Sequence, residues 1–135
     1  MTPASELTER RELPARREQV TQKVRIGGKR TLYMSVHADE HPGELFLRVK
    51  GRDCTSETIA LYDILARLTS LALQYGAPLA QVAGMLHQTK FEPCGPVLDH
   101  SRIKFCTSIP DFIGRHLLIE FCGREELAHV REVAG

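Results

Sequence analysis

Between residues 20 and 50 the sequence alternates apolar and polar positions, the pattern of strands that bury one face. The first predicted strand ends at Gly27-Gly28, a hairpin signal, and the second covers Lys29–His37. His41-Pro42-Gly43 predicts another turn, after which a third strand follows. The residues expected to face the core are Val20, Gln22, Val24, Ile26, Leu32, Met34, Val36, Leu45, Leu47 and Val49.

After Gly51 the apolar spacing changes to that of helices. Thr55 or Ser56 can cap a helix that Gly76 ends. A second helix is expected to begin with Pro78 in its first turn. The apolar positions are Ile59, Leu61, Ile64, Leu65, Leu68, Leu71 and Ala72 in the first helix, and Leu79, Val82, Ala83 and Leu86 in the second. Residues 89–101 contain two prolines and a glycine, and we expect them to form a loop.

The segment Thr107-Ser108-Ile109-Pro110-Asp111 predicts the start of a third helix. Ser108 lies three residues before Asp111, the spacing of a capping box with Asp in place of Glu. Pro110 fits an early helical position, and Asp111 favours the positive end of the helix dipole. We therefore interpret Thr107, Ser108, Pro110 and Asp111 as structural, with contact to an anion or ligand as the alternative. This helix is expected to end near Cys122-Gly123, and Arg124–Val133 can add a short fourth.

These elements predict an α+β fold: a three-stranded antiparallel sheet packed on one face by three to four helices. The 135 residues suit one domain, which we place at residues 19–135. Residues 1–18 are rich in charge and contain two prolines, so we expect a flexible charged tail, with a partner-binding arm as the alternative.

Composition narrows the class of protein without identifying it. The formal net charge is +1, so no global field attracts nucleic acid or membrane. Hydrophobic residues make up 42% and charged residues 26%, as in ordinary globular proteins. The sequence has no apolar run of membrane-spanning length and no signal-peptide pattern, so a cytoplasmic location and no membrane partner are expected.

Alternation also gathers basic and aromatic residues on the outer face of the sheet, opposite the core. Such a surface can bind nucleic acid or a nucleotide through phosphate contacts and base stacking. A solvated face and a homodimer interface are the alternatives. The candidate binding residues are Lys23, Arg25, Lys29, Arg30, Tyr33, Phe46, Arg48 and Lys50, with Arg52 just beyond them.

Cysteine and histidine spacing gives no strong sign of a metal or catalytic centre. The four cysteines form no C-x-x-C pair, and buried free thiols are the commoner interpretation of such cysteines. Cys54, Cys94 and Cys106, joined by His100 or Cys122, are weak candidates for a metal site. No catalytic residue is predicted, because nothing in the sequence brings an acid, a base and a nucleophile together.

Several motifs in fixed order resemble a known family. FEP at 91–93, Ile103-Lys104, TSIPD at 107–111 and GREELAHV at 123–130 resemble the C-terminal domain of adenosylcobalamin-dependent (class II) ribonucleotide reductases. That domain is called TSCPD after its Thr-Ser-Cys-Pro-Asp motif. The resemblance extends back through residues 65–79 to 43–46 and covers roughly residues 23–130. Ile109 stands where many relatives have cysteine, and it removes a thiolate from the metal site suspected in short relatives.

In the large reductases the resemblance implies a terminal domain beside a catalytic barrel that binds adenosylcobalamin. Because that barrel cannot fit into 135 residues, we expect no cofactor in this chain and no reductase activity from it alone. The favoured hypothesis is a free-standing accessory or adaptor of ribonucleotide reduction, and so of deoxyribonucleotide synthesis for DNA replication. Its expected partner is a separate reductase subunit, and a homodimer is a further option. The alternative is a recruited binding protein that uses the basic sheet face for nucleic acid, a nucleotide or a protein.

Overall fold

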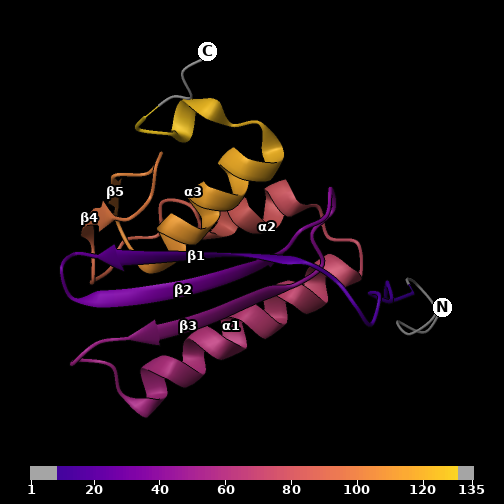
Figure 1. Ribbon diagram of the computed structural model, residues 1–135, viewed down its shortest axis with the longest axis horizontal. Coiled ribbons are helices and arrows are strands. Elements are labelled where there is room, and N and C mark those ends of the chain that lie inside the picture. The colour runs from indigo at the N-terminus through magenta and orange to yellow at the C-terminus, as the bar shows by residue number, and fades with distance from the viewer. Residues whose placement is uncertain (1–8, 131–135) are drawn as a thin grey trace, which may run out of the picture.

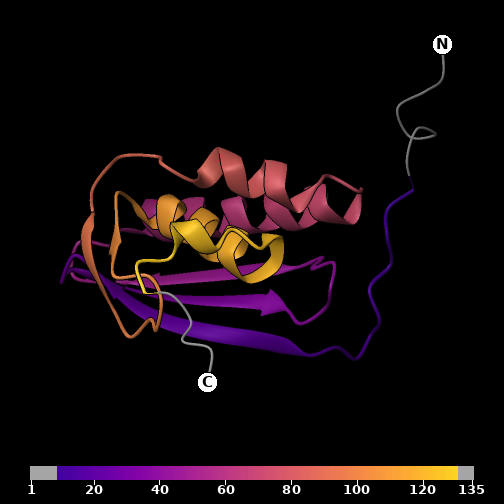
Figure 2. The ribbon, with the colours of Figure 1, turned by 90° about the horizontal axis from the view of Figure 1, so that it is seen from above.

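The computed structural model describes residues 9–130, which form a sheet with helices on one of its faces (Figures 1 and 2). This arrangement confirms the predicted α+β class. The elements in chain order are β1 (Gln19–Ile26), β2 (Arg30–His37), β3 (Leu45–Lys50), α1 (Ser56–Gln74), α2 (Leu79–Leu86), β4 (Gly95–Leu98), β5 (Phe105–Cys106), α3 (Ile109–Cys122) and a 3₁₀ helix (Glu125–Leu127).

The sheet has five strands in the order β3-β2-β1-β4-β5, so the prediction of three strands was incomplete. β4 lies inside the segment expected to be a loop, and it pairs antiparallel with the end of β1 through Arg25↔Leu98 and Ile26↔Val97. β5 then pairs with β4. These strands have four and two residues, too few to show an alternation, and Pro96 lies inside β4. Their pairing partners, not their own pattern, make them strands.

The Gly27-Gly28 turn joins β1 and β2. It also leaves space for the segment that leads into β4. Both glycines have positive φ, +61° and +67°, and the Lys29 amide donates to the Ile26 carbonyl at 3.1 Å. Because Ile26 pairs with Arg30, residues 27–29 form a three-residue turn, and its two glycines supply the positive φ values. A Cβ on Gly27 would lie 2.6 Å from the Cys94 carbonyl oxygen, so a glycine is required where the segment before β4 crosses the turn.

Helix α1 forms as predicted. Thr55 is its N-cap and accepts from the Thr58 amide at 3.2 Å, and Gly76 follows its end with φ +93°. Its buried residues are Tyr62, Ala66, Thr69, Leu73 and Gln74. The predicted apolar positions divide between two sides of the helix, and only Leu65 among the larger ones packs against the core. Leu61, Ile64, Leu68 and Leu71 are exposed.

Ser70 joins α1 to the free edge of β3. Its hydroxyl accepts from the Leu45 amide at 2.8 Å. The same hydroxyl lies 2.8 Å from the Ala66 carbonyl and 3.1 Å from the Leu45 carbonyl, either of which can take its proton. One side chain therefore satisfies backbone groups of β3 that a neighbouring strand would otherwise bind.

Helix α3 buries nine of its 14 residues and begins as predicted. Ser108 is its N-cap, Pro110 lies in its first turn, and Gly123 ends it in the left-handed conformation. Ile109, Phe112 and Ile113 are fully buried. Helix α2 packs on α3 so closely that a Cβ on Gly114 would lie 2.6 Å from both the Ala83 carbonyl oxygen and the His87 amide nitrogen.

The inward-facing residues of the three long strands are mostly as predicted. Leu32, Met34, Val36, Leu45, Leu47 and Val49 are buried, as are Val24 and Ile26. Val20 is instead 65% exposed and Gln22 is half-buried. The difference arises because β4 pairs with the last two residues of β1 and leaves its first half at an open edge.

Part of the predicted N-terminal tail contacts the domain. Arg10 Nε donates to Gln74 Oε1 at 2.7 Å, and the Arg11 amide donates to the Gln74 carbonyl at 2.7 Å. The Arg17 guanidinium binds both carboxylate oxygens of Glu44, at 2.5 and 2.6 Å. Residues 1–8 of that tail lie outside the described residues, as do residues 131–133 of the predicted fourth helix. Among residues 9–130, no helix is long and apolar enough to cross a membrane.

Candidate functional site

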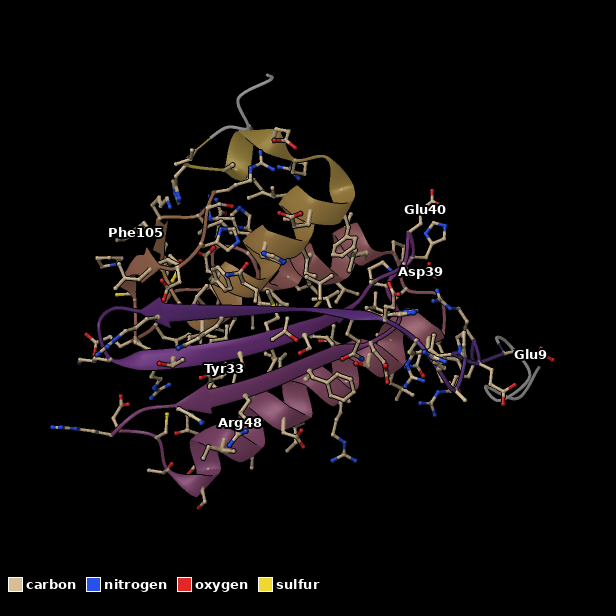
Figure 3. All side chains as sticks on the ribbon, in the orientation of Figure 1. Glu9, Tyr33, Asp39, Glu40, Arg48 and Phe105 are labelled. Carbon is tan, nitrogen blue, oxygen red and sulfur yellow. The ribbon has the colours of Figure 1, made fainter. Side chains whose placement is uncertain are left out.

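No helix of the described chain covers the outer face of the sheet (Figure 2). This face carries a row of basic and aromatic side chains. Lys23 lies opposite Tyr33 on the neighbouring strand, and Tyr33 lies opposite Arg48 on the next. Directly paired residues of an antiparallel sheet point to the same face, so the three form one row across β1, β2 and β3. Figure 3 labels Tyr33 and Arg48 on this face. We call the surface built on this row the basic sheet face.

The Tyr33 ring is held between two ammonium groups. Lys23 Nζ lies 5.8 Å and Lys50 Nζ 5.5 Å from the ring centroid, within the range of cation–π attraction. Lys50 comes from the adjacent row, in which Arg25 pairs with Thr31 and Thr31 with Lys50. The sheet register thus brings a lysine from each neighbouring strand close to one aromatic ring, an arrangement suited to contact with phosphate groups.

Beside this row the loops form a basic depression of about 640 Å³. Four cationic side chains line it: Arg25, Lys29, Lys50 and Arg52. Its carboxylate, Asp53, is already paired with Arg30 through two contacts of 3.3 Å. The hydrogen bond from Arg30 lowers the pKa of Asp53, which therefore stays ionised and bound to Arg30. Four cations remain to face an incoming anion.

Arg30 is the predicted binding residue that the structure does not place on the basic sheet face. It pairs with Ile26, whose side chain points into the core, so Arg30 points to the helix side of the sheet. Its side chain is 12% exposed and lies against Asp53. Lys23, Arg25, Tyr33, Phe46, Arg48 and Lys50 are on the outer face as predicted, with Lys29 at its rim.

A second polar cluster surrounds Asp111 at the start of α3. This carboxylate is fully buried and accepts from the Gln88 amide at 2.6 Å, from the Thr107 amide at 3.0 Å and from His87 Nδ1 at 3.1 Å. Burial alone would raise the pKa of Asp111, but the hydrogen bonds from the Thr107 and Gln88 amides, together with the nearby charge of Arg115, lower it below its usual value. The carboxylate holds the end of α2 against the start of α3, which fits the structural interpretation of the motif.

His100 and His116 form a third polar contact, inside the protein. The His100 Nδ1 atom accepts from the amides of Arg102 and Ile103, at 3.0 and 2.9 Å. Its Nε2 atom must therefore carry the proton, which it donates to His116 Nδ1 at 3.0 Å. Burial lowers the pKa of each histidine from 6.5 to about 4, so both rings are neutral near pH 7.

The cysteines do not converge on a metal site. Within residues 9–130, no group of three or more His, Cys, Asp or Glu side chains is placed to hold an ion. Cys106 is buried, and burial raises its pKa to about 12, so its thiol stays protonated. Cys54 and Cys122 are half-buried and Cys94 is exposed. Of the four cysteines, only Cys106 is therefore fully buried, as expected for a buried free thiol.

The histidine pair and the His87–Asp111 contact were not predicted from the sequence. His100 and His116 are separated by 16 residues, and His87 and Asp111 by 24. No spacing rule for a single helix or strand connects residues so far apart. Asp111 itself was singled out, because its capping position is a local signal.

Known proteins and a family model are similar to nearly the whole chain. The family model described as the TSCPD domain matches residues 5–120. The protein named vitamin B12-dependent ribonucleotide reductase in Bradyrhizobium diazoefficiens is 38% identical over 128 residues, which cover 92% of this chain and 10% of that protein. The proteins of the same name are 38% identical over 123 residues in Agrobacterium fabrum and 33% identical over 113 residues in Rhodopirellula baltica. The match to the Agrobacterium fabrum protein covers 90% of this chain and 10% of that protein. The match to the Rhodopirellula baltica protein covers 83% of this chain and 11% of that protein. No solved structure matches.

Proposed function

Because the chain belongs to the TSCPD domain family, we propose that it acts as a non-catalytic accessory module of vitamin B12-dependent ribonucleotide reduction. In this proposal it docks onto a reductase and supplies no reacting group. The observation that carries the proposal is the identity of 38% across nine-tenths of this chain, matched to about a tenth of each reductase.

The internal polar clusters support a structural rather than a catalytic role. Asp111 uses its carboxylate oxygens on two backbone amides and a histidine of the same chain. His100 likewise binds two backbone amides, and with the pKa of both paired histidines at about 4 neither ring changes charge near pH 7. The buried ionisable side chains therefore stabilise the fold, and the surfaces of the protein remain available for a partner.

Binding to a reductase of the matched kind tests the proposal. We would mix the chain with the Bradyrhizobium diazoefficiens reductase, either complete or with its matching segment deleted, and measure co-elution and binding heat. The deletion variant should bind the chain more tightly than the complete reductase does, because its docking position is vacant. The reductase activity of the deletion variant in the presence of adenosylcobalamin should rise when the chain is added. Cobalamin binding would show that the deletion variant is folded. Absence of binding to both forms would contradict the proposal.

A second candidate function is binding of a nucleotide or single-stranded nucleic acid by the basic sheet face. The cation–aromatic–cation contact at Tyr33 and the adjacent basic depression specifically favour it. Affinity for a labelled oligonucleotide should then fall with salt. Lys23→Ala or Arg48→Ala should each reduce the slope of log affinity against log salt by roughly 0.7. The exposed lysine of the α2–β4 loop provides the control, since Lys90→Ala should leave that slope unchanged. Equal effects of all three substitutions would remove this candidate.

A further inference from the structure

Helix α1 carries a second apolar stripe on the side that does not face the sheet. Its residues are alternately three and four positions apart, which is the spacing of a seam between two paired helices. They are Leu61 (57% exposed), Ile64 (45%), Leu68 (61%), Leu71 (39%) and Tyr75 (45%). The core-facing side of the same helix is already filled by Tyr62, Ala66, Thr69 and Leu73. The stripe therefore needs no place in this chain's own core.

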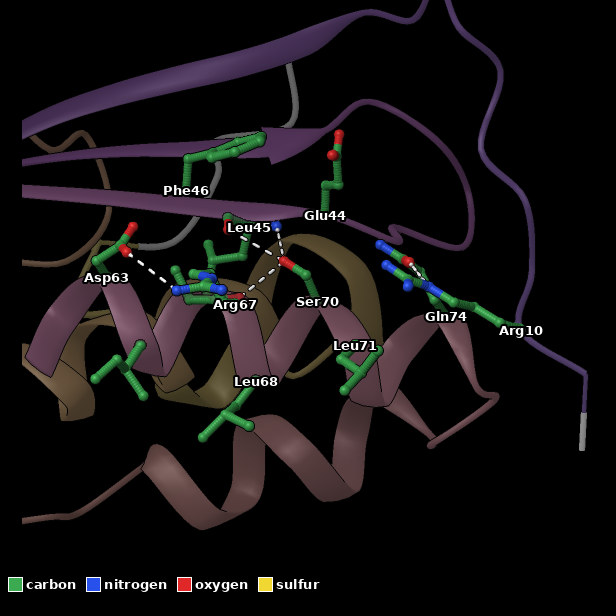
Figure 4. A pocket seen from close by; sticks show the side chains of 12 residues that line it. Arg10, Glu44, Leu45, Phe46, Asp63, Arg67, Leu68, Ser70, Leu71 and Gln74 are labelled. Atoms are coloured by element: carbon green, nitrogen blue, oxygen red, sulfur yellow. Dashed lines mark hydrogen bonds and ion pairs between the residues drawn. The ribbon is translucent and has the colours of Figure 1, made fainter. Parts of the chain in front are cut away.

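The stripe borders a groove of about 700 Å³ between α1 and the free edge of β3 (Figure 4). Ile64, Leu68 and Leu71 line it from the helix, and Phe46, 51% exposed, lines it from the strand. With about half of each side chain accessible, the five stripe residues and Phe46 expose on the order of 500 Å² of apolar surface. That is as large as the largest apolar patch on a typical monomer and more than half of one partner's share of a standard interface.

Four charged residues along this groove alternate in sign. Asp63 and Arg67 are one turn apart on α1, 3.9 Å from each other. Glu44 follows at the level of Ser70, because Ser70 binds the neighbouring residue Leu45. Arg10 comes last, held at the level of Gln74 by its 2.7 Å hydrogen bond. Figure 4 shows this order along the helix: negative, positive, negative, positive.

When two copies of this series are laid side by side in opposite directions, each negative charge meets a positive one. When a second copy lies antiparallel, with a two-fold axis level with Leu68, Asp63 faces Arg10 of the second copy and Arg67 faces its Glu44. The stripe is centred on the same residue, because Leu61 and Tyr75 are each seven positions from Leu68. Like charges would meet in neither place. A two-fold interface requires this kind of self-complementarity.

We propose that a second copy of this chain docks antiparallel along the α1–β3 groove and forms a two-fold dimer with Leu68 at its axis. The dimer joins the two stripes into one apolar interface flanked by four ion pairs. Glu44 already binds Arg17, so the Asp63–Arg10 pairs are the more informative ones to test. The proposal stands apart from the proposed function, because a reductase could bind a monomer or a dimer.

Sedimentation over a range of protein concentrations tests self-association. Leu68→Glu should weaken it at least tenfold, roughly the effect expected for a charge placed at the centre of an apolar interface. The matched control is Met85→Glu, because Met85 is 80% exposed on α2 and lies outside the groove, and self-association should be unchanged. Both substituted residues are exposed, so circular dichroism should show both variants folded.

Cysteine crosslinking tests the antiparallel register. In a Cys94→Ser background, which removes the exposed thiol, Leu68→Cys should give a disulfide-linked dimer on mild oxidation. Leu61→Cys and Tyr75→Cys should crosslink poorly alone and efficiently when the two variants are mixed. Charge exchange gives a second measure: Asp63→Arg and Arg10→Asp should each weaken the dimer, and their combination should restore it.

Two results would overturn the proposal. The first is a chain that stays monomeric at every concentration or that self-associates equally well with Leu68→Glu. The second is a monomer whose binding to the reductase is lost with Leu68→Glu, which would assign the groove to the reductase. Failure to bind a reductase while Leu68→Glu still abolishes self-association would instead contradict the proposed function and leave the dimer in place.

Discussion

Asp111 is a buried carboxylate whose oxygens serve two backbone amides and a histidine ring. Asp111→Asn should lower the free energy of unfolding by about 2–3 kcal/mol, because it replaces charge-assisted hydrogen bonds and turns an amide NH₂ toward a backbone donor. Urea denaturation measures the loss. Glu120→Gln on the exposed side of the same helix is the control and should change stability by less than about 0.5 kcal/mol. Equal effects of the two substitutions would contradict the assigned role of Asp111.

The His100–His116 contact predicts a loss of stability in mild acid. In the unfolded chain both rings take up protons near pH 6.5, whereas in the folded protein they resist protonation until about pH 4. The unfolded state therefore binds more protons as the pH falls from 6.5 to 4, and stability must decrease over that range. The melting temperature should fall accordingly.

His116→Gln keeps a hydrogen-bond acceptor and removes one titrating group, so it should flatten this dependence of melting temperature on pH. His41→Gln, on an exposed residue, is the matched control and should leave the dependence unchanged. If His116→Gln behaved like the control, the paired rings would not be the source of the acid sensitivity.

At this scale, sequence reasoning succeeds where the partners are close in the chain. Ser108 accepts from the Asp111 amide at 2.9 Å, one of the two bonds of the predicted capping box, whereas the Asp111 carboxylate accepts from the Thr107 amide and not from the Ser108 amide. Sequence reasoning fails for Arg30, which was expected among the residues of the outer sheet face but points inward beside Asp53. One residue of register decides between the two faces of a strand, and turn length set that register here.

Among the helices, the contact between α2 and α3 depends on one glycine. Gly114→Ala should destabilise the protein by about 1–3 kcal/mol, because the added methyl group meets backbone atoms of α2 that cannot rotate away. Gly84 is the matched control: it lies in α2 with open space around its Cα, so Gly84→Ala should stabilise by about 0.5–1 kcal/mol. Thermal melts of the two variants should shift in opposite directions. Shifts in the same direction would contradict the assigned packing.

Long elements were predictable and short ones were not. β2 and β3 alternate over eight and six residues, enough for the pattern to identify the strand and its buried face. β4 and β5 are strands because β1 ends beside them, information that a local pattern does not contain. Helix α1 was correctly predicted as a helix, but its apolar positions did not show which side faces the sheet, because Leu61, Ile64, Leu68 and Leu71 are exposed on the stripe.

Taken as a whole, the molecule has one apolar core that includes residues from β1 to β4 and from all three α-helices. We therefore expect a single cooperative unfolding transition. Far-ultraviolet circular dichroism and the intrinsic tyrosine fluorescence, to which the buried Tyr62 contributes, should report the same midpoint. Separate midpoints would show that part of the structure unfolds independently.

The two long surfaces of the molecule differ in chemistry, although the net charge is only +1. The outer side of the sheet is basic, whereas the α1–β3 groove is apolar with alternating charges. Alternation along the strands was sufficient to predict the first surface. The second depends on how α1 is rotated against β3, which packing determines, and so the sequence pattern alone did not locate it.

The Ser70 hydroxyl has a consequence for how this sheet meets its surroundings. The Ser70 hydroxyl accepts from the outward-pointing amide of Leu45. That amide is therefore not free to donate to a strand of another molecule that pairs with the edge of β3. Pairing alternates along the strand, so the outward amides that remain belong to Leu47 and Val49, too short a template for fibre-like growth. Replacing this hydroxyl would lengthen that template by one rung and should make the protein more prone to stack into insoluble ribbons.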